Sequence, residues 1–324
     1  MNLKKLAFAT FALGSSGLAF SQFEILATET AMGSISNPLD WKGIQRYGFA
    51  NNGAAAITLS GISAGAVADP AGLFFANGEL FVGNRHGNSN ASSVSRFTFD
   101  QGTDSFSANG AITGNGLFGV HGVSIRPSTN NLYAANVNNG ISSFTITPGG
   151  ATANGMLATG AIRDTMFSAD GANMYYTAGI NGNLVRYNFA TATFNTYSIG
   201  GASGLHFGNW RGNDLYVSDF GTGQVFSIQF DSNGAVVGSS SIASSAGAIG
   251  VAFSPDNMEM FVSSHTSNNI KRYMYNNGTS SWDFQSTIAT GTNMGDIQVI
   301  AVPEPASIVV LGIGALAMLR RRKK

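Results

Sequence analysis

A short strand-like pattern recurs five times along this chain, and its regular interval limits the folds that the chain can adopt. Each copy has Leu or Met, then Phe or Tyr, then Val, Ala or Tyr, and the copies begin at Leu80, Leu132, Met174, Leu215 and Met260. The interval between copies is 41 to 52 residues, and a second segment of β-branched and aromatic residues starts 9 to 14 residues after each one. Such alternation is typical of a strand with one buried face. The regular interval indicates one structural unit repeated along the chain.

Each pair of segments is flanked on both sides by the signals of a further strand. Tight-turn sequences precede the pair, as in the Ser-Ala-Asp-Gly run at 168–171 and the Ser-Pro-Asp-Asn run at 254–257, and such steps favour hairpins. A weaker strand follows the pair, as at 194–199 and 235–238. Four short antiparallel strands per repeat is the period of a β-propeller blade. The turn at 168–171, followed by Met-Tyr-Tyr at 174–176, resembles the repeat of YVTN-type, lactonase-like and TolB-like propellers, and this resemblance implies a fold rather than an activity.

The material outside the five copies completes a sixth unit. Residues 24–29, 44–49 and 54–59 read as three strands, and 296–302 reads as the missing innermost strand, so both ends of the body would share one sheet. Such closure removes the free sheet edges that would otherwise aggregate. We therefore predict an all-β propeller of six blades, or of seven if the 52-residue copy or the N-terminal stretch contains another sheet. A β-sandwich or an open solenoid is disfavoured, because neither would show this constant four-strand period.

The first 21 residues have the order of a secretory signal peptide. Lys4 and Lys5 precede a mainly apolar run at 6–20, and small residues at Ala19 and Ser21 offer a cleavage site before Gln22. We predict a signal helix at 1–21, a single propeller domain at 22–301 and a C-terminal segment with a hydrophobic helix at 302–324. The body at 22–302 holds 16 acidic against 10 basic residues, which argues against binding nucleic acid.

Three elements follow one another in the C-terminal segment. They are the Pro303-Glu304-Pro305 motif, an uncharged run at 306–319, and the basic cluster Arg320, Arg321, Arg322, Lys323 and Lys324. The uncharged run spans roughly 21 Å as a helix, short of the ~30 Å hydrocarbon core of a bilayer. The segment resembles the PEP-CTERM sorting signal of exported bacterial proteins. That resemblance implies transient anchoring in the inner membrane, cleavage by an exosortase, and delivery to the cell surface or the extracellular space; an ordinary tail anchor is the alternative.

Propellers usually bind ligands where their innermost strands begin, around the central channel. Aligning the repeats places glycine-rich pairs at that entrance, Ser203-Gly204 among them. The strongly polar residues of this ring are His121, Arg163, Asp164 and Asp296, which could hold an anion or a sugar hydroxyl, or supply an acid and a base. Simple pairing of Asp164 with Arg163, or capping of a strand, is the structural alternative.

A second polar set lies in the loops after the second strands of the repeats. Its members are Asn84, Arg85, His86, Asn136, Asp219 and His265. If these loops share a face with the ring, His86 or His265 with Asp219 could approach a ligand or a metal ion. The lactonase-like resemblance implies a divalent cation such as calcium, held by several carboxylate and amide oxygens, and this chain offers only three scattered aspartates and some asparagines for it. Motifs of other hydrolases and of nucleotide-binding proteins are missing, and no cysteine is present for a thiolate site.

These observations predict an exported propeller that acts in the cell envelope or extracellular matrix as a binding or surface module; a non-enzymatic role is favoured, and enzymatic activity stays open. Its expected partners are an exosortase-type enzyme and an extracellular polysaccharide. The alternative is a metal-dependent, lactonase-like hydrolase with its site at the mouth of the channel. Three or more converging oxygen ligands at the channel would favour the hydrolase, whereas a weakly polar channel would favour the binding module.

Overall fold

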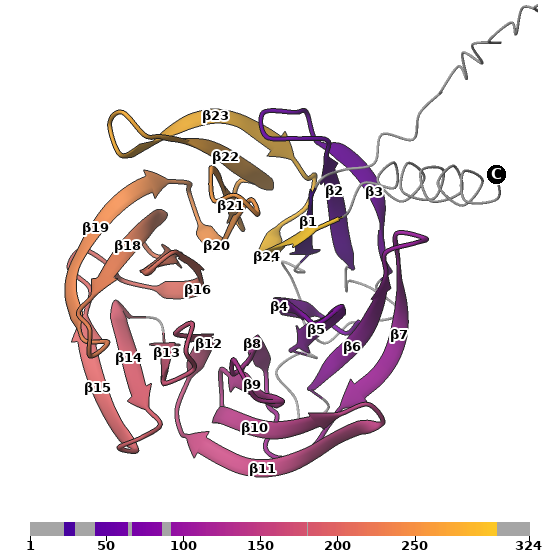
Figure 1. Ribbon diagram of the computed structural model, residues 1–324, viewed down its shortest axis with the longest axis vertical. Helices are drawn as coiled ribbons and strands as arrows, with labels where there is room; N and C mark the ends of the chain where they lie inside the picture. The colour runs from indigo at the N-terminus through magenta and orange to yellow at the C-terminus, as the bar shows by residue number, and fades with distance from the viewer. Residues whose placement is uncertain (1–22, 30–42, 64–66, 86–91, 180, 303–324) are drawn as a thin grey trace, which may run out of the picture.

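Six four-stranded antiparallel sheets surround a central axis in the computed structural model (Figure 1). The structure describes residues 23–29, 43–63, 67–85, 92–179 and 181–302, and within these ranges the only regular elements are strands. The prediction of an all-β propeller with six blades is confirmed. The long interval after Leu80 contains no extra sheet, because blade 2 has four strands like the others. The predicted helices at 1–21 and 302–324 lie outside the described residues, apart from Val302.

The strands are numbered along the chain and grouped here into blades 1 to 6, each given from the innermost strand outwards. Blade 1 contains β24 (Met294–Ala301), β1 (Phe23–Glu29), β2 (Ile44–Phe49) and β3 (Ile57–Ile62). Blade 2 contains β4 (Pro70–Ala76), β5 (Glu79–Asn84), β6 (Ser93–Asp100) and β7 (Ser105–Ile112); blade 3 contains β8 (Val120–Ile125), β9 (Asn131–Asn136), β10 (Gly140–Thr147) and β11 (Gly150–Ala158). Blade 4 contains β12 (Ile162–Phe167), β13 (Asn173–Ala178), β14 (Asn183–Asn188) and β15 (Thr193–Ser198). Blade 5 contains β16 (Leu205–Arg211), β17 (Asp214–Asp219), β18 (Gln224–Phe230) and β19 (Val236–Ser244); blade 6 contains β20 (Ala248–Phe253), β21 (Glu259–Ser264), β22 (Asn269–Asn276) and β23 (Ser281–Ala289).

The ring is closed by strands from both ends of the body. β24 pairs with β1 over a register that includes Phe23 opposite Ala301 and Ile25 opposite Val299. The six innermost strands begin on one face of the disc, called the upper face here, and end on the lower face. Turns between second and third strands therefore lie on the upper face, whereas turns between first and second strands, and between third and fourth strands, lie on the lower face.

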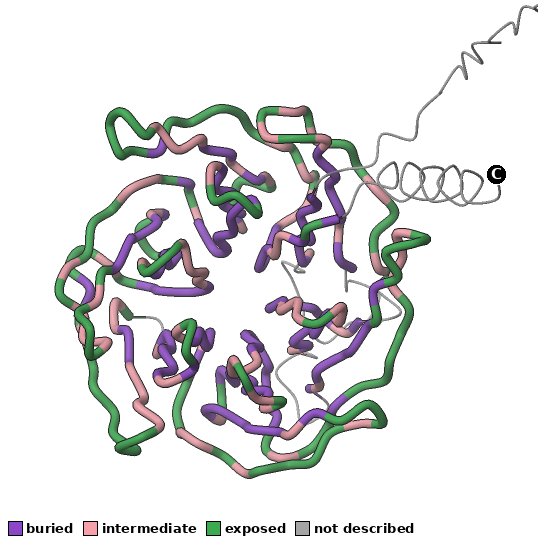
Figure 2. Tube along the Cα trace, viewed as in Figure 1, coloured by how far each residue is buried: buried purple, intermediate pink, exposed green. Residues whose placement is uncertain are grey.

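The hydrophobic core is divided into six clusters, one at each junction between blades. At the junction of blades 6 and 1, for example, Phe23 stacks on Phe49 at 5.0 Å, and Phe261 tilts against Phe49 at 5.4 Å. Burial falls from the inner strands to the outer strands (Figure 2). Because each blade buries one side against each neighbour, no blade can form its core alone, which is why the ring must close.

An arginine also crosses each junction near the lower face. Each donates to a turn of the next blade: Arg46 to Asp104, Arg96 to Thr147 and Gly150, Arg126 to Gly171, Arg186 to Asn233, Arg211 to Asn257 and Arg272 to Ala54. Arg46, Arg96 and Arg272 are in addition paired with a glutamate of their own blade. These arginines are therefore structural, and their charge is not available to a ligand.

Hydroxyl groups hold four of the junctions closer to the axis. Each comes from a second strand and donates to a backbone carbonyl of the next inner strand: Thr28 to Ala71, Thr177 to His206, Ser218 to Ile249 and Ser263 to Gly295. At the two junctions on either side of β8, the corresponding positions are Gly83 and Ala135, which have no hydroxyl. The inner strands β8 and β12 therefore join their preceding blade without this hydrogen bond.

Candidate functional site

The mouth of the central channel is formed by irregular pieces of strand. Each inner strand has a β-bulge beside its first residues, where its register against the neighbouring strand shifts. Bulges re-aim side chains and are common near binding sites. The residues at this point of the six inner strands are Ala71, His121, Arg163, His206, Ile249 and Gly295. Three of the six are apolar or glycine, so the polar side chains gather on one side of the mouth, on blades 3, 4 and 5.

Arg163 and His121 form a pair at this mouth. Arg163 Nη1 lies 3.3 Å from His121 Nε2. Because a guanidinium has no acceptor, His121 Nε2 must accept this hydrogen bond, and the neutral imidazole then carries its proton on Nδ1. His121 Nδ1 and Arg163 Nε are both buried and have no hydrogen-bond partner among the described residues. The mouth therefore presents two buried donors that lack an acceptor.

The histidines of the mouth are neutral. Burial lowers the pKa of His121 well below its usual range, and the charges of Arg85 and Arg163 lower it further. Burial, together with the charge of Arg163, lowers the pKa of His206 to about 4. Burial lowers the pKa of His265 as well, more than its hydrogen bond to Met294 O at 3.2 Å raises it. The positive charge of the mouth therefore comes from arginine and not from imidazolium.

Within the described ranges, the charge of Arg163 is not met by an anionic or carbonyl oxygen. Arg85, the other arginine at this end, pairs with buried Asp69 at 2.6 Å. Among the described residues, every arginine except Arg163 donates to a carboxylate or to a backbone carbonyl oxygen, whereas Arg163 donates only to an imidazole. Burial and the nearby Arg85 lower the pKa of Arg163, but a guanidinium remains charged at neutral pH.

Phe207 forms the floor of the mouth. It is buried in a small cluster with Ala71 and Ile249, which come from blades 2 and 6, so its ring spans the axis of the channel. The His121 ring is nearly parallel to it, with centroids 6.2 Å apart. On the upper side, Phe220 is 38% exposed, and its ring lies 5.6 Å from that of His206. We call His121, Arg163, His206, Phe207 and Phe220 together the cup: they combine an apolar floor, a cationic side and an exposed aromatic rim.

Asp164 and Asp296 lie below this floor. Asp164 accepts hydrogen bonds from the N–H groups of Thr165 and Gly208, and Asp296 accepts them from Leu73 and Ile297. Both carboxyl groups line a cavity of about 160 Å³ whose other walls are mostly apolar. Burial raises the pKa of Asp296 to about 7, and burial together with the charge of Asp296 raises the pKa of Asp164 well above its usual range. The four residues predicted as one ring therefore occupy two levels, and Asp164 does not pair with Arg163.

The second predicted set shares the upper face with the mouth, but its side chains are engaged in loop structure. Asn84, Asn136 and Asp219 are fully buried, and each accepts a hydrogen bond from the loop that leads into the inner strand of its own blade. His265 contacts Phe220, with ring centroids 5.8 Å apart. His86 lies outside the described residues. These contacts fix the loops around the mouth rather than adding donors to it.

The expected divalent cation has no ligand set in the part of the chain that the structure describes. No group of three His, Cys, Asp or Glu side chains there could hold a metal ion. The two aspartates of the lower cavity already use both carboxylate oxygens to accept backbone N–H groups, as given above.

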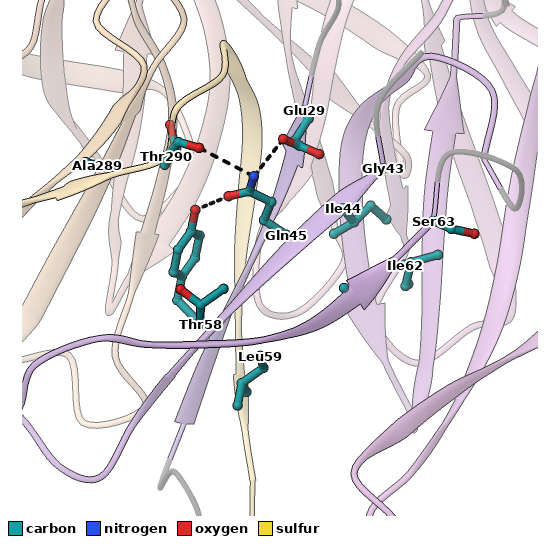
Figure 3. Close-up of a pocket in the computed structure, with 12 residues that line it drawn as sticks. Glu29, Gly43, Ile44, Gln45, Thr58, Leu59, Ile62, Ser63, Ala289 and Thr290 are labelled. Atoms are coloured by element: carbon teal, nitrogen blue, oxygen red, sulfur yellow. Dashed lines mark hydrogen bonds between the residues drawn. The ribbon is translucent and has the colours of Figure 1, made fainter. Parts of the chain in front are cut away.

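A second hollow lies between blades 1 and 6, near the upper ends of β2, β3 and β23 (Figure 3). It encloses about 580 Å³ and contains a hydrogen-bonded chain in which Tyr47 donates to Gln45, and Gln45 Nε2 donates to Glu29 Oε1 at 2.6 Å. Thr292 also donates to Glu29. This network satisfies its own polar groups, so the hollow lacks the unpartnered donors found at the mouth.

Sequence alignment of the repeats did not identify His206, Phe207 or Phe220. It aligned Ser203-Gly204 with the entrance, but these residues precede β16, whose bulge is at His206 and Phe207. The signal was present, since Leu205-His206 follows the same order as Val120-His121. The glycine-rich turn before β16 obscured it by supplying an equally good match nearby.

Comparison with known proteins assigns the C-terminal segment and the fold. Residues 301–323 match the PEP-CTERM protein-sorting motif. The periplasmic gluconolactonase of Pseudomonas aeruginosa superposes with a TM-score of 0.63 at 15% identity, covering 87% of this chain and 99% of that one. A candidate 6-phosphogluconolactonase of Bacteroides fragilis gives 0.62 at 17% identity, covering 88% and 99%. A chain of a nidogen/laminin complex gives 0.62 at 12% identity, covering 86% and 98%. No curated protein matches this chain.

The motif match and the structural similarities support different conclusions. The sorting motif implies export, membrane anchoring before processing, and processing by an exosortase-type enzyme. Identities of this size show the fold alone, and the similar structures include both named lactonases and a binding complex. The motif residues Pro303, Glu304, Pro305, Arg320, Arg321 and Arg322, like the predicted signal peptide, lie outside the described residues. Among the described residues, no helix could cross a membrane.

Proposed function

We propose that this protein is an exported binding module that holds a small organic anion, of the sugar-acid class, in the cup at the upper mouth of its channel. The observation that carries the proposal is Arg163, which among the residues that the structure describes donates only to an imidazole. A carboxylate or phosphate would supply both the acceptors and the negative charge that the cup lacks, since guanidinium groups bind such oxyanions through paired hydrogen bonds.

The attraction of an anion to Arg163 is confined to the cup, because the rest of the propeller is acidic. The body at 22–302 carries more acidic than basic residues, so its general field repels anions. Within the cup, however, Arg163 and the Nδ1–H of His121 are donors, and the nearby carboxylates of Asp164 and Asp296 lie below Phe207. An anion that enters the cup therefore meets donors first and carboxylates only beyond an apolar floor.

Two observations support a sugar acid as the class of anion. The exposed ring of Phe220 at the rim offers an apolar surface on which the C–H face of a sugar can stack. Two of the similar structures bear gluconolactonase names, and a gluconolactone opens to a sugar acid.

Titration calorimetry of the full chain with gluconate, inorganic phosphate and glucose tests the proposal. We expect gluconate and phosphate to bind and neutral glucose to fail. Arg163→Gln removes the charge and should weaken gluconate binding by roughly tenfold to a hundredfold, the usual range for a charged hydrogen bond. Arg186→Gln, at an arginine that donates to Asn195 of its own blade and to Asn233 of blade 5, away from the mouth, should bind as the wild type does. Absence of anion binding to the wild type, or equal binding by Arg163→Gln, would contradict the proposal.

Lactone hydrolysis is the second candidate, and the neutral imidazoles beside a guanidinium favour it. The base would be His206, because Nε2 of His121 already accepts from Arg163, whereas Nδ1 of His206 lies 3.1 Å from Gly204 O and donates to it, which leaves Nε2 as the acceptor. This Nε2 would accept a proton from a water molecule that attacks the lactone carbonyl, and the ring C–O bond then breaks to give the acid. Arg163 would stabilise the negative charge on the carbonyl oxygen. Hydrolysis of δ-gluconolactone above the spontaneous rate, lost in His206→Gln, would establish this function. Binding of gluconate without faster hydrolysis of the lactone would contradict this second candidate and support the binding module.

A further inference from the structure

The direction of β24 relates the candidate site to the sorting signal. This strand begins at Met294 on the upper face, where Met294 O contacts His265, and it passes Asp296 at the level of the lower cavity. It ends at Ala301, which is paired with Phe23 on the lower face. Because strands rise about 3.3 Å per residue, these two ends lie roughly 23 Å apart. The C-terminal segment therefore leaves the propeller on the face opposite the cup.

No spacer separates the propeller from the sorting signal. Val302 is only 6% exposed and packs in the same cluster as Leu26 and Ile300, so the chain is fixed within the propeller up to this residue. The matched motif begins at residue 301, within β24 itself. Only Pro303, Glu304 and Pro305 stand between Val302 and the uncharged run at 306–319, and three extended residues reach at most about 11 Å.

We propose that the anchored protein stands with its lower face toward the membrane and its cup, with Arg163 and His121, toward the outside. The short connection enforces this orientation mechanically. Adsorption of the lower face to lipid does not set this orientation. Its turns contain exposed acidic side chains that anionic headgroups would repel, namely Asp170, Asp231 and Asp256. The cup would also face outward after cleavage near Pro303. The new C-terminus would lie on the lower face, so a group attached to it would hold the protein by that face.

Two single-cysteine variants on either side of β22 test this orientation. The chain has no cysteine, so Ser267→Cys on the upper face and Asn277→Cys on the lower face each give one labelling site. Both positions are exposed and in the same blade, next to blade 1, and the intervening strand spans roughly 26 Å. The labelled full chain is inserted into phosphatidylcholine vesicles, recovered by flotation, and exposed to a lipid-borne paramagnetic quencher.

We expect the label at 277 to be quenched roughly threefold more than the label at 267, because paramagnetic effects fall steeply over a separation of this size. Equal quenching, stronger quenching at 267, or a chain that does not float would overturn the proposal. A flexible insert of 20 Gly and Ser residues between Val302 and Pro303 adds a reach of roughly 25 Å. This insert should abolish the difference, and a difference that persists would show that surface adsorption, not the short connection, sets the orientation.

Discussion

The free energy of unfolding of the wild-type protein should fall as the pH rises, because Asp296 ionises. Replacing Asp296 by asparagine should reduce this pH dependence. Burial raises the pKa of Asp296 from 3.8 to about 7. A raised pKa means that the folded state binds a proton more tightly than the unfolded state does, so this contribution to stability is complete below about pH 4 and is lost as the pH rises through 7. A shift of about 3 units corresponds to about 4 kcal/mol, at 1.36 kcal/mol per unit.

The asparagine removes the titration but keeps the shape. It also loses one of the two acceptors for Leu73 N–H and Ile297 N–H, a penalty of about 1–3 kcal/mol that does not depend on pH. Urea unfolding at intervals between pH 4 and 8 should therefore show Asp296→Asn less stable than the wild type at low pH, with the gap closing or reversing at high pH.

Asp100 supplies a control of opposite sign. It is exposed, and hydrogen bonds from Thr103 and Gly102 lower its pKa, so its contribution to stability is present above its unfolded pKa and is lost as the pH falls. The difference between the wild type and Asp100→Asn should thus stay nearly constant from pH 8 to about pH 4 and shrink only when the measurement is extended below the unfolded pKa of 3.8. A difference between the wild type and Asp296→Asn that stays constant from pH 4 to 8 would refute the reasoning, because it would mean that Asp296 titrates alike in both states.

Two further changes test how the inner strands are held. Ser263→Ala removes the donor to Gly295 O and should lower the free energy of unfolding by about 1–3 kcal/mol, measured by urea unfolding, whereas Ser267→Ala, an exposed matched change, should have little effect. Gly83→Ala would place a Cβ 2.8 Å from His121 O, so β8 must shift; we expect lower stability together with weaker gluconate binding in calorimetry. Unchanged binding in Gly83→Ala would show that the cup does not depend on the position of β8.

The blade repeat could be predicted from the sequence because the buried positions of each blade require apolar residues at a regular interval. Leu80-Phe81-Val82 and its counterparts face two neighbouring blades, so each must be apolar, and the closing strand at the C-terminal end of the body follows the same requirement. Even so, the outer strand of blade 1 begins at Ile57 and not at residue 54, since an outer strand has few buried side chains to mark its start.

The arrangement of the site could not be read in the same way. Arg163 and Asp164 are adjacent in sequence, yet a bulge directs one to the cup and the other to the cavity beneath Phe207. The buried roles of Asn84 and Asp219 depend on loop N–H groups whose positions are set by the fold. That six arginines bridge the blades, and that Arg163 does not, is visible only when the turns of the neighbouring blade are in place.

The two strands that lack a hydroxyl link to the preceding blade are also the two that carry His121 and Arg163. Thr28, Thr177, Ser218 and Ser263 each hold a carbonyl of the next inner strand, and β8 and β12 are the exceptions because Gly83 and Ala135 precede them. At β8 the glycine allows a close approach, since a Cβ there would meet His121 O at 2.8 Å. His121 and Arg163 thus lie at the two junctions without the hydroxyl hydrogen bond. At β8 the position is filled by close backbone packing against Gly83, and at β12 by the methyl group of Ala135. Stability at these junctions comes instead from the apolar clusters, from Arg96 and Arg126 at the lower face, and from two other hydrogen bonds. Gly119 N–H donates to Ser92 Oγ just ahead of β8, and the hydroxyls of Ser124 and Thr165 join β8 to β12.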